Sequence, residues 1–136
     1  MQPTTARDFL RVARQRLDVA AEIMHYLRRN LEAQYIGGYS VECSLKSLIL
    51  EKTPSESLDQ TLQKLTRGAQ CHRPEVLLGR LRDLGVSLNL QLARRMRRFD
   101  WTTDLRYEIG RRDTGETKAL LKTAEAIYRW VESQIT

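Results

Sequence analysis

The sequence has few of the residues that cross-link a chain or interrupt its helices. Its 136 residues include two cysteines, three prolines and seven glycines. Cys43 and Cys71 do not have the spacing of metal ligands or of a CxxC pair, and two isolated thiols do not form a disulfide framework. We therefore expect a protein of a reducing compartment that holds no metal and no cofactor.

Long apolar runs are also missing. The wholly apolar stretches, such as Leu48-Ile49-Leu50, are only a few residues long, whereas a membrane helix needs about 20 apolar residues. Polar and charged residues occur in the first turns, unlike in a secretory signal. These features predict a cytoplasmic protein with no membrane partner.

The composition is that of a globular protein with a basic surface. The chain is 41% hydrophobic and 29% charged, and its length suits a single domain over residues 1–136. The net charge of +6, mostly from arginine, favours polyanionic partners such as nucleic acids. The alternative is a solvated basic surface without a partner.

Helical periodicity covers most of the chain and predicts an all-α fold. Apolar residues recur every three or four positions, which favours helices over 4–28, 31–52, 55–66, 74–85, 88–98 and from 113 to the end. Thr5, Thr53 and Asp113 have the sequence context of helix N-caps, the second of them in the capping box Thr53-Pro54-Ser55-Glu56. We predict an antiparallel bundle of about five to six helices.

Two segments depart from this regular pattern. Gly37 and Gly38 lie inside the second predicted helix, where glycine is unfavourable, so we expect another backbone or a ligand to come close to them. Residues 99–113, FDWTTDLRYEIGRRD, lack helical periodicity. This segment is predicted to be a structured loop anchored by its aromatic residues.

A charged pair, Glu42 and Lys46, lies in an apolar part of the second helix. The two residues are four positions apart, on a stripe shared with Tyr35, Tyr39 and Ile49. We expect them to be at least partly buried, and buried ion pairs are kept more often for specificity or a site than for stability. The alternative is a surface salt bridge worth about 0.3–0.5 kcal/mol.

Residues 33–46, AQYIGGYSVECSLK, resemble the AxYxxGYxxExxLK signature of HEPN-domain proteins. Further similarities are the first helix, ARDFLRVARQRLDVAAEI, His72 before the fourth helix, the Trp101 to Tyr107 element, and the closing AIYRWVESQI. The resemblance implies a helical bundle that commonly forms homodimers and acts on RNA or nucleotides. It also implies a role as a ribonuclease toxin or as the partner of an antitoxin or a small nucleotidyltransferase.

The ribonuclease motif of that family, R-x4-6-H, is incomplete. Arg106 matches its arginine, but Arg111 stands where the histidine would be, and a guanidinium cannot act as a base near neutral pH. An R-x4-H spacing also occurs from Arg67 to His72, which we interpret as coincidence, although His72 can still face the site. The resemblance without the histidine favours binding over cleavage.

An arginine-rich segment gives the second line of argument for an RNA ligand. Seven arginines occur between positions 94 and 112, interleaved with the aromatic residues Phe99, Trp101 and Tyr107. Guanidinium groups and stacking aromatics are used to bind single-stranded RNA. Alternatively, the aromatic residues only attach the loop to the bundle, while the arginines are solvated or pair with acidic residues.

These patterns lead to one functional hypothesis and two alternatives. The protein is predicted to bind RNA or a nucleotide in a toxin–antitoxin, defence or stress-response system. The predicted ligand-contacting residues are Arg106, Arg111, Arg112 and Tyr107, supported by Glu42, Lys46 and Tyr39. One alternative is a diverged, metal-independent endoribonuclease with Arg106 and His72 as its catalytic candidates. The other is a non-catalytic subunit that docks an antitoxin or a nucleotidyltransferase.

Overall fold

The chain folds into helices joined by short connections, as the sequence predicts. The computed structural model describes residues 2–98, 101 and 103–135, and these residues contain no strand. Their α-helices are α1 Ala6–Glu22, α2 Asn30–Lys52, α3 Leu58–Thr66, α4 Pro74–Asp83, α5 Leu90–Arg97 and α6 Thr114–Gln134. Shorter helical turns are η1 Ile23–Leu27, η2 Ser55–Ser57, η3 Ala69–His72 and η4 Thr103–Tyr107.

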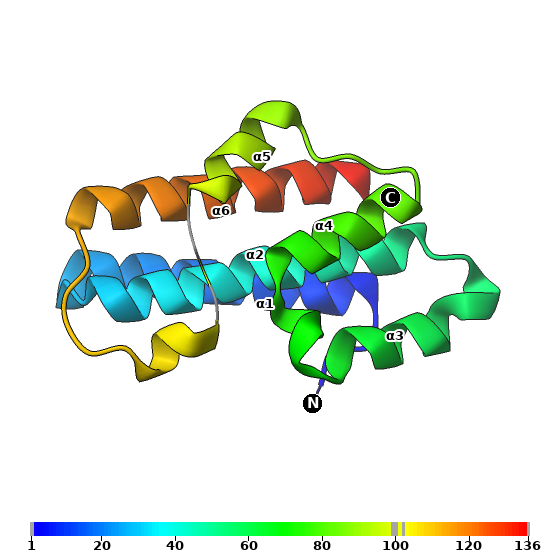
Figure 1. Cartoon of the computed structure of the whole chain (residues 1–136), viewed down its shortest axis with the longest axis horizontal. Helices are drawn as coiled ribbons and strands as arrows, with labels where there is room; N and C mark the ends of the chain where they lie inside the picture. The colour runs from blue at the N-terminus through cyan, green and yellow to red at the C-terminus, as the bar shows by residue number, and fades with distance from the viewer. Residues whose placement is uncertain (1, 99–100, 102, 136) are drawn as a thin grey trace.

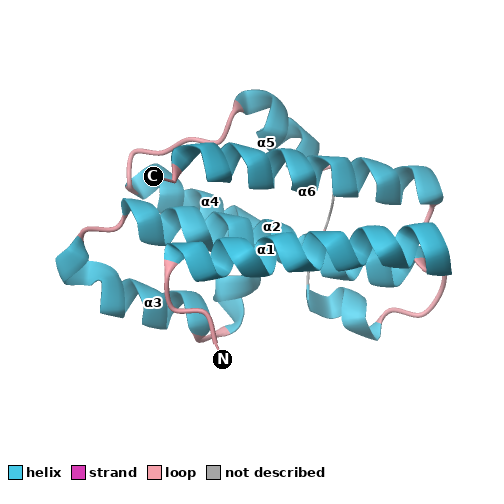
Figure 2. Ribbon diagram, turned by 180° about the vertical axis from the view of Figure 1, so that it is seen from behind, coloured by secondary structure: helices cyan, strands magenta, loops and turns pink. Residues whose placement is uncertain are grey.

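The helices surround α2, which contacts α1, α3, α4, α6 and η4 (Figure 1). Consecutive helices reverse direction along the long axis of the molecule, and α1 and α2 form an antiparallel hairpin. Helix α6 packs on both α1 and α2 and runs in the same direction as α2 (Figure 2). As a result, α2 and α6 both begin at the left end of Figure 1.

Small residues on α2 let α1 approach closely. Every residue from 40 to 50 is buried, so this part of α2 has no solvent-exposed face. The hydroxyl of Ser40 donates to the carbonyl of Ala13 at 2.8 Å, and that of Ser47 donates to the carbonyl of Ala6 at 2.6 Å. These bonds satisfy buried hydroxyl groups and bring the backbones of α1 and α2 together.

The two glycines of α2 make room for bulky side chains, where we expected another backbone or a ligand. A Cβ on Gly37 would lie 2.6 Å from Leu121 Cδ2. A Cβ on Gly38 would lie 1.9 Å from Trp101 Nε1. Any side chain at these positions would therefore displace α6 or the indole of Trp101.

The helix ends agree with the sequence in two of the three predicted caps. Thr5 Oγ1 accepts from the amide of Asp8, and Asp113 accepts from the amide of Glu116. The capping box at Thr53 is wrong, because the Thr53 hydroxyl donates backwards to the carbonyl of Ile49 at 2.6 Å. The next segment instead begins with the 3-10 turn η2.

The first helix also ends differently from the prediction. Its α-helical part stops at Glu22, and residues Ile23–Leu27 form a π-helical turn. Arg28 then takes a left-handed conformation, with φ of 54°, and this reversal starts the return along α2. Among the described residues, no helix is both long and apolar enough to cross a membrane.

The close contact between Gly38 and Trp101 predicts opposite effects for two glycine substitutions. Gly38→Ala should destabilise the protein by about 1–3 kcal/mol, because the new methyl group overlaps the indole. Gly79→Ala on α4 should stabilise it by up to about 1 kcal/mol, since its Cβ would meet nothing closer than 3.9 Å. Urea unfolding followed by circular dichroism measures both, and equal effects would contradict the packing described here.

Candidate functional site

The middle of α2 holds a buried ion pair. Lys46 Nζ donates to Glu42 Oε2 at 2.8 Å, and each residue is only 4% exposed. The prediction that the pair is at least partly buried is therefore confirmed. Removing either ion from water costs several kcal/mol, so each charge depends on the presence of the other.

His72 is the second partner of Glu42. The turn η3 places its Nδ1 at 3.2 Å from both carboxylate oxygens of Glu42, although the two residues are 30 positions apart. The His72 side chain is 39% exposed, so it links the buried carboxylate to the surface. When Nδ1 donates its proton to a carboxylate, Nε2 is the nitrogen left free to accept a proton.

Two cysteines lie near this pair without becoming reactive. Burial raises the pKa of the Cys43 thiol to about 12, and the charge of Glu42 raises it too, while Lys46 opposes the shift. Burial also raises the pKa of Cys71, whose thiol donates to the carbonyl of Gly68. Both thiols therefore stay protonated near pH 7, and a protonated thiol is a poor nucleophile.

The loop before α6 is attached to α2 by Trp101 and two tyrosines. The indole of Trp101 donates to the carbonyl of Tyr35 at 3.1 Å, and its ring packs edge-on against Tyr39 with centroids 5.2 Å apart. The hydroxyls of Tyr35 and Tyr39 are 3.0 Å apart. Trp101 thus acts as the aromatic anchor that the sequence predicts for this loop.

The charges of both the ion pair and the loop influence the phenol of Tyr39. Burial raises the pKa of Tyr39, its hydrogen bond to Tyr35 and the charge of Glu42 add to the increase, and Arg106 lowers it. The phenol is therefore neutral near pH 7. The loop is attached to α2 through the contacts of Trp101 with Tyr35 and Tyr39. Glu42 instead has Lys46 and His72 as its close partners.

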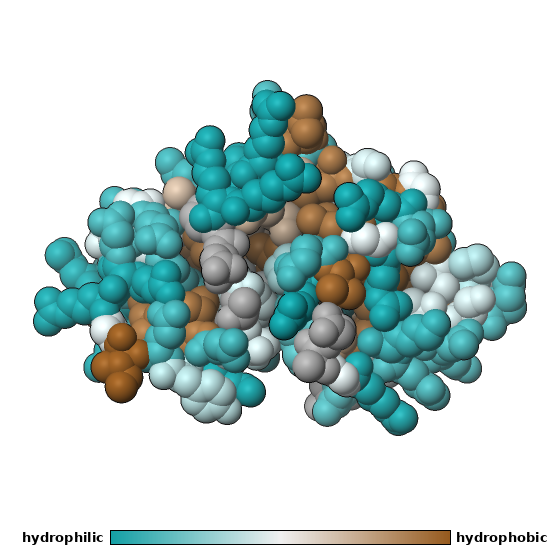
Figure 3. Space-filling view, viewed as in Figure 1, coloured by the Kyte–Doolittle hydropathy of each residue, from teal (hydrophilic) through white to brown (hydrophobic). Residues whose placement is uncertain are grey.

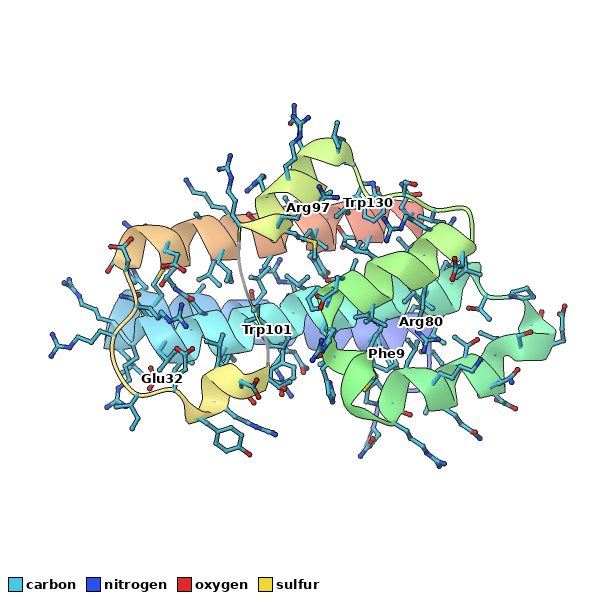
Figure 4. The ribbon with its side chains drawn as sticks, in the orientation of Figure 1. Phe9, Glu32, Arg80, Arg97, Trp101 and Trp130 are labelled. Carbon is cyan, nitrogen blue, oxygen red and sulfur yellow. The ribbon has the colours of Figure 1, made fainter. Side chains whose placement is uncertain are left out.

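Four arginines line a pocket at the end of the molecule where α2 and α6 begin. Its volume is about 640 Å³, and we call it the basic pocket. Arg28 and Arg29 precede α2, whereas Arg111 and Arg112 precede α6. The remaining lining residues are Asn30, Leu31, Glu32, Gly110 and Thr114. Figure 4 labels Glu32 in the first turn of α2 at this end.

Local hydrogen bonds hold the two sides of the basic pocket together. Asn30 Nδ2 donates to the carbonyl of Arg112 at 3.1 Å and to Thr114 Oγ1 at 3.0 Å. Arg112 forms ion pairs with Glu108 and Glu116, which partly neutralise its charge. Arg28, Arg29 and Arg111 have exposed side chains, and they give the pocket its excess of positive charge.

The N-terminus of α2 adds to this positive potential. Free amide groups and the helix dipole make the start of a helix favourable for anions. Helices α2 and α6 start side by side at the basic pocket (Figure 1). The start of α2 has no side-chain cap, whereas the Asp113 carboxylate already caps an amide of α6. The arrangement can therefore bind a phosphate or another multiply charged anion.

The predicted ligand-contacting residues fall into two groups. Arg111 and Arg112 line the basic pocket, whereas Arg106 and Tyr107 lie outside its lining, on η4. The Arg106 guanidinium covers the Tyr107 ring at 4.8 Å, and Tyr107 is 73% exposed. Tyr107 therefore does not anchor the loop as predicted, and Phe99 lies outside the described residues.

Sequence reasoning missed Arg28 and Arg29. Their only local signal is the run Arg28-Arg29-Asn30 at a junction between two helices, where an asparagine can bridge two segments. Among the described residues, no group of three His, Cys, Asp or Glu side chains could hold a metal ion. The chain matches no protein-family model, and no curated protein or solved structure matches it significantly.

The buried ion pair yields a prediction about stability. Glu42→Gln should destabilise the fold by about 3–5 kcal/mol, because Lys46 would remain buried without a countercharge. The double variant Glu42→Gln with Lys46→Met should recover much of this loss, since no unpaired charge remains. Urea unfolding gives both values.

A surface pair provides the control for this prediction. Arg129 pairs with Glu125 at 2.9 Å, but the Arg129 side chain is 68% exposed. Arg129→Gln should therefore change the free energy of unfolding by less than about 1 kcal/mol. A double variant at positions 42 and 46 that is no more stable than Glu42→Gln would show that the buried charge is not the cause.

Proposed function

We propose that this chain is a HEPN-like helical bundle that binds RNA or a nucleotide, and that the basic pocket holds a phosphate group of the ligand. The observation that carries the proposal is the convergence of four arginines and the uncapped N-terminus of α2 around one concave site. A guanidinium donates two parallel hydrogen bonds to phosphate oxygens, which gives both affinity and orientation.

The surface beside the basic pocket suits the rest of such a ligand. Arg106 and Tyr107 on η4 offer a guanidinium and an exposed aromatic ring next to each other. Bases of single-stranded RNA stack on such rings, and arginine contacts the adjoining backbone. In this proposal, Glu42, Lys46 and Tyr39 are structural support, because they stabilise the part of α2 on which the loop rests.

The family resemblance supplies the biological setting of the proposal. A HEPN-like protein of this kind would work in the cytoplasm as a homodimer, in a toxin–antitoxin, defence or stress-response system. The net charge of +6 agrees with an RNA ligand, because binding would release counterions from the phosphates. Affinity should therefore fall steeply as salt is added.

Two charge-matched double variants test the proposal. Arg28→Gln with Arg111→Gln removes two guanidinium groups from the basic pocket, whereas Arg94→Gln with Arg98→Gln removes two exposed ones from α5 and its C-cap. The first should weaken binding at least about tenfold, because hydrogen bonds to charged groups are lost. The second should change it less than about threefold.

The measurement is fluorescence anisotropy of a labelled oligouridine at low salt, with ATP as a competitor. Equal losses in the two double variants would mean that the ligand meets a general basic surface and not a built pocket. Wild-type protein that binds neither the oligouridine nor ATP would contradict the proposal altogether.

One observation favours endoribonuclease activity as a second candidate function. His72 is oriented by the buried carboxylate of Glu42, as in a carboxylate–histidine dyad. In this reaction Nε2 accepts the proton of a ribose 2′-hydroxyl, and the 2′-oxygen attacks the phosphorus. The 5′-oxygen leaves and takes a proton from water, so the products are a 2′,3′-cyclic phosphate and a 5′-hydroxyl, and His72 later returns its proton to solvent.

His72→Ala and His25→Ala separate this activity from binding. If the dyad is catalytic, wild-type protein cleaves RNA to 2′,3′-cyclic phosphate ends and arrests growth on expression, and His72→Ala abolishes both. His25 is exposed on η1, so His25→Ala should leave both unchanged. Wild-type protein that leaves RNA intact would overturn the catalytic candidate but not the binding proposal.

A further inference from the structure

A second cavity, unrelated to the basic pocket, opens over the middle of α2. Its volume is about 380 Å³, within the usual range for small-molecule sites. Helices α4, α5 and α6 contribute Leu78, Met96 and Leu120 to its lining, and Val41 comes from α2. In Figure 3, hydrophobic side chains are visible at the bottom of a hollow below α5. We call it the apolar cavity.

Trp101 forms a rigid aromatic wall of the apolar cavity. Its indole is held by the hydrogen bond to Tyr35, and Gly38 provides the space in which it lies. The ring is therefore positioned before any ligand arrives. A preformed aromatic surface reduces the conformational entropy that binding would otherwise cost.

The polar residues of the apolar cavity favour an anion. Arg82 on α4 and Arg97 on α5 line it from two helices, against a single carboxylate, Glu75. Within the described part of the chain, no carboxylate forms an ion pair with either arginine. Figure 4 labels Arg97 on α5 and Trp101 nearer to α2, and both line the cavity.

We propose that the apolar cavity binds a small aromatic carboxylate. Its ring would pack between Trp101, Met96 and Leu78, and its carboxylate would accept hydrogen bonds from Arg82 and Arg97. Arg82 and Arg97 are exposed and therefore hydrated, and a hydrocarbon without charge would gain no hydrogen bond from either of them. A ligand with several phosphates would place charge against the apolar floor, which is unfavourable.

The test compares 4-phenylbutanoate with the uncharged 4-phenylbutan-1-ol. Trp101 and Trp130 are the two tryptophans of the chain, so Trp130→Phe leaves Trp101 as the single tryptophan reporter, excited selectively over the tyrosines. In this background the carboxylate should change the emission of Trp101 and saturate. The alcohol should bind at least about tenfold more weakly, because it makes no charge-assisted hydrogen bond.

Variants on one helix locate the ligand. Arg97→Gln should weaken carboxylate binding about tenfold, whereas Arg94→Gln, also on α5 but outside the lining, should change it less than about twofold. Ala93→Phe should abolish binding by filling the cavity. Circular dichroism checks that each variant is folded. If Ala93→Phe does not fold, Arg97→Gln still tests the proposal.

Two results would overturn the proposal. The first is no saturable change in Trp101 emission with the carboxylate at concentrations up to about 10 mM. The second is equal affinity for the alcohol and the carboxylate, unaffected by Arg97→Gln. Both results depend on residues outside the basic pocket. Failure of this proposal is therefore distinguishable from failure of RNA or nucleotide binding in the basic pocket.

Discussion

The ion pair between Lys46 and Glu42 is the constraint around which the other helices are arranged. Two charges in the middle of a fully buried helix segment are tolerated only when they meet each other, here at 2.8 Å. Because helical geometry already brings positions four apart together, the pair forms within α2 itself. His72 supplies the additional polar contact and thereby fixes η3 against the central helix. Glu42 thus links the buried ion pair to a residue of η3 that is 30 positions away in the sequence.

The helices could be predicted from the sequence because their signals are local. Thr5 and Asp113 cap the amides that follow them, and apolar periodicity marks the buried face of α6. A local pattern does not predict the structure where it is compatible with two different structures. The apolar rhythm continues past Glu22, so it cannot reveal the π-helical turn. The Thr53 hydroxyl has an acceptor in the preceding helix, and this contact displaces the cap that the sequence favours.

The candidate sites were less predictable, because they join residues that are distant in the sequence. Arg111 and Arg112 stand out in an arginine-rich segment, but nothing local places Arg28 and Arg29 opposite them. That placement depends on α2 and α6 starting at the same end of the bundle. The sequence marks His72 only as a catalytic candidate and cannot pair it with Glu42, because that contact spans 30 positions. The sequence predicted the contact between Glu42 and Lys46, which are four positions apart, but not the contacts between residues distant in the chain.

The left-handed conformation of Arg28 shows where folding and surface charge have opposed requirements. Glycine adopts φ of 54° without steric strain, whereas arginine there costs on the order of 1 kcal/mol. The chain nevertheless places an arginine at this bend, and its side chain lines the basic pocket. The total stability of a domain is roughly 5–15 kcal/mol, so this loss of stability is a sizeable fraction of it. The turn that closes the first hairpin is therefore less stable than it would be with glycine, but it places a positive charge in the lining of the basic pocket.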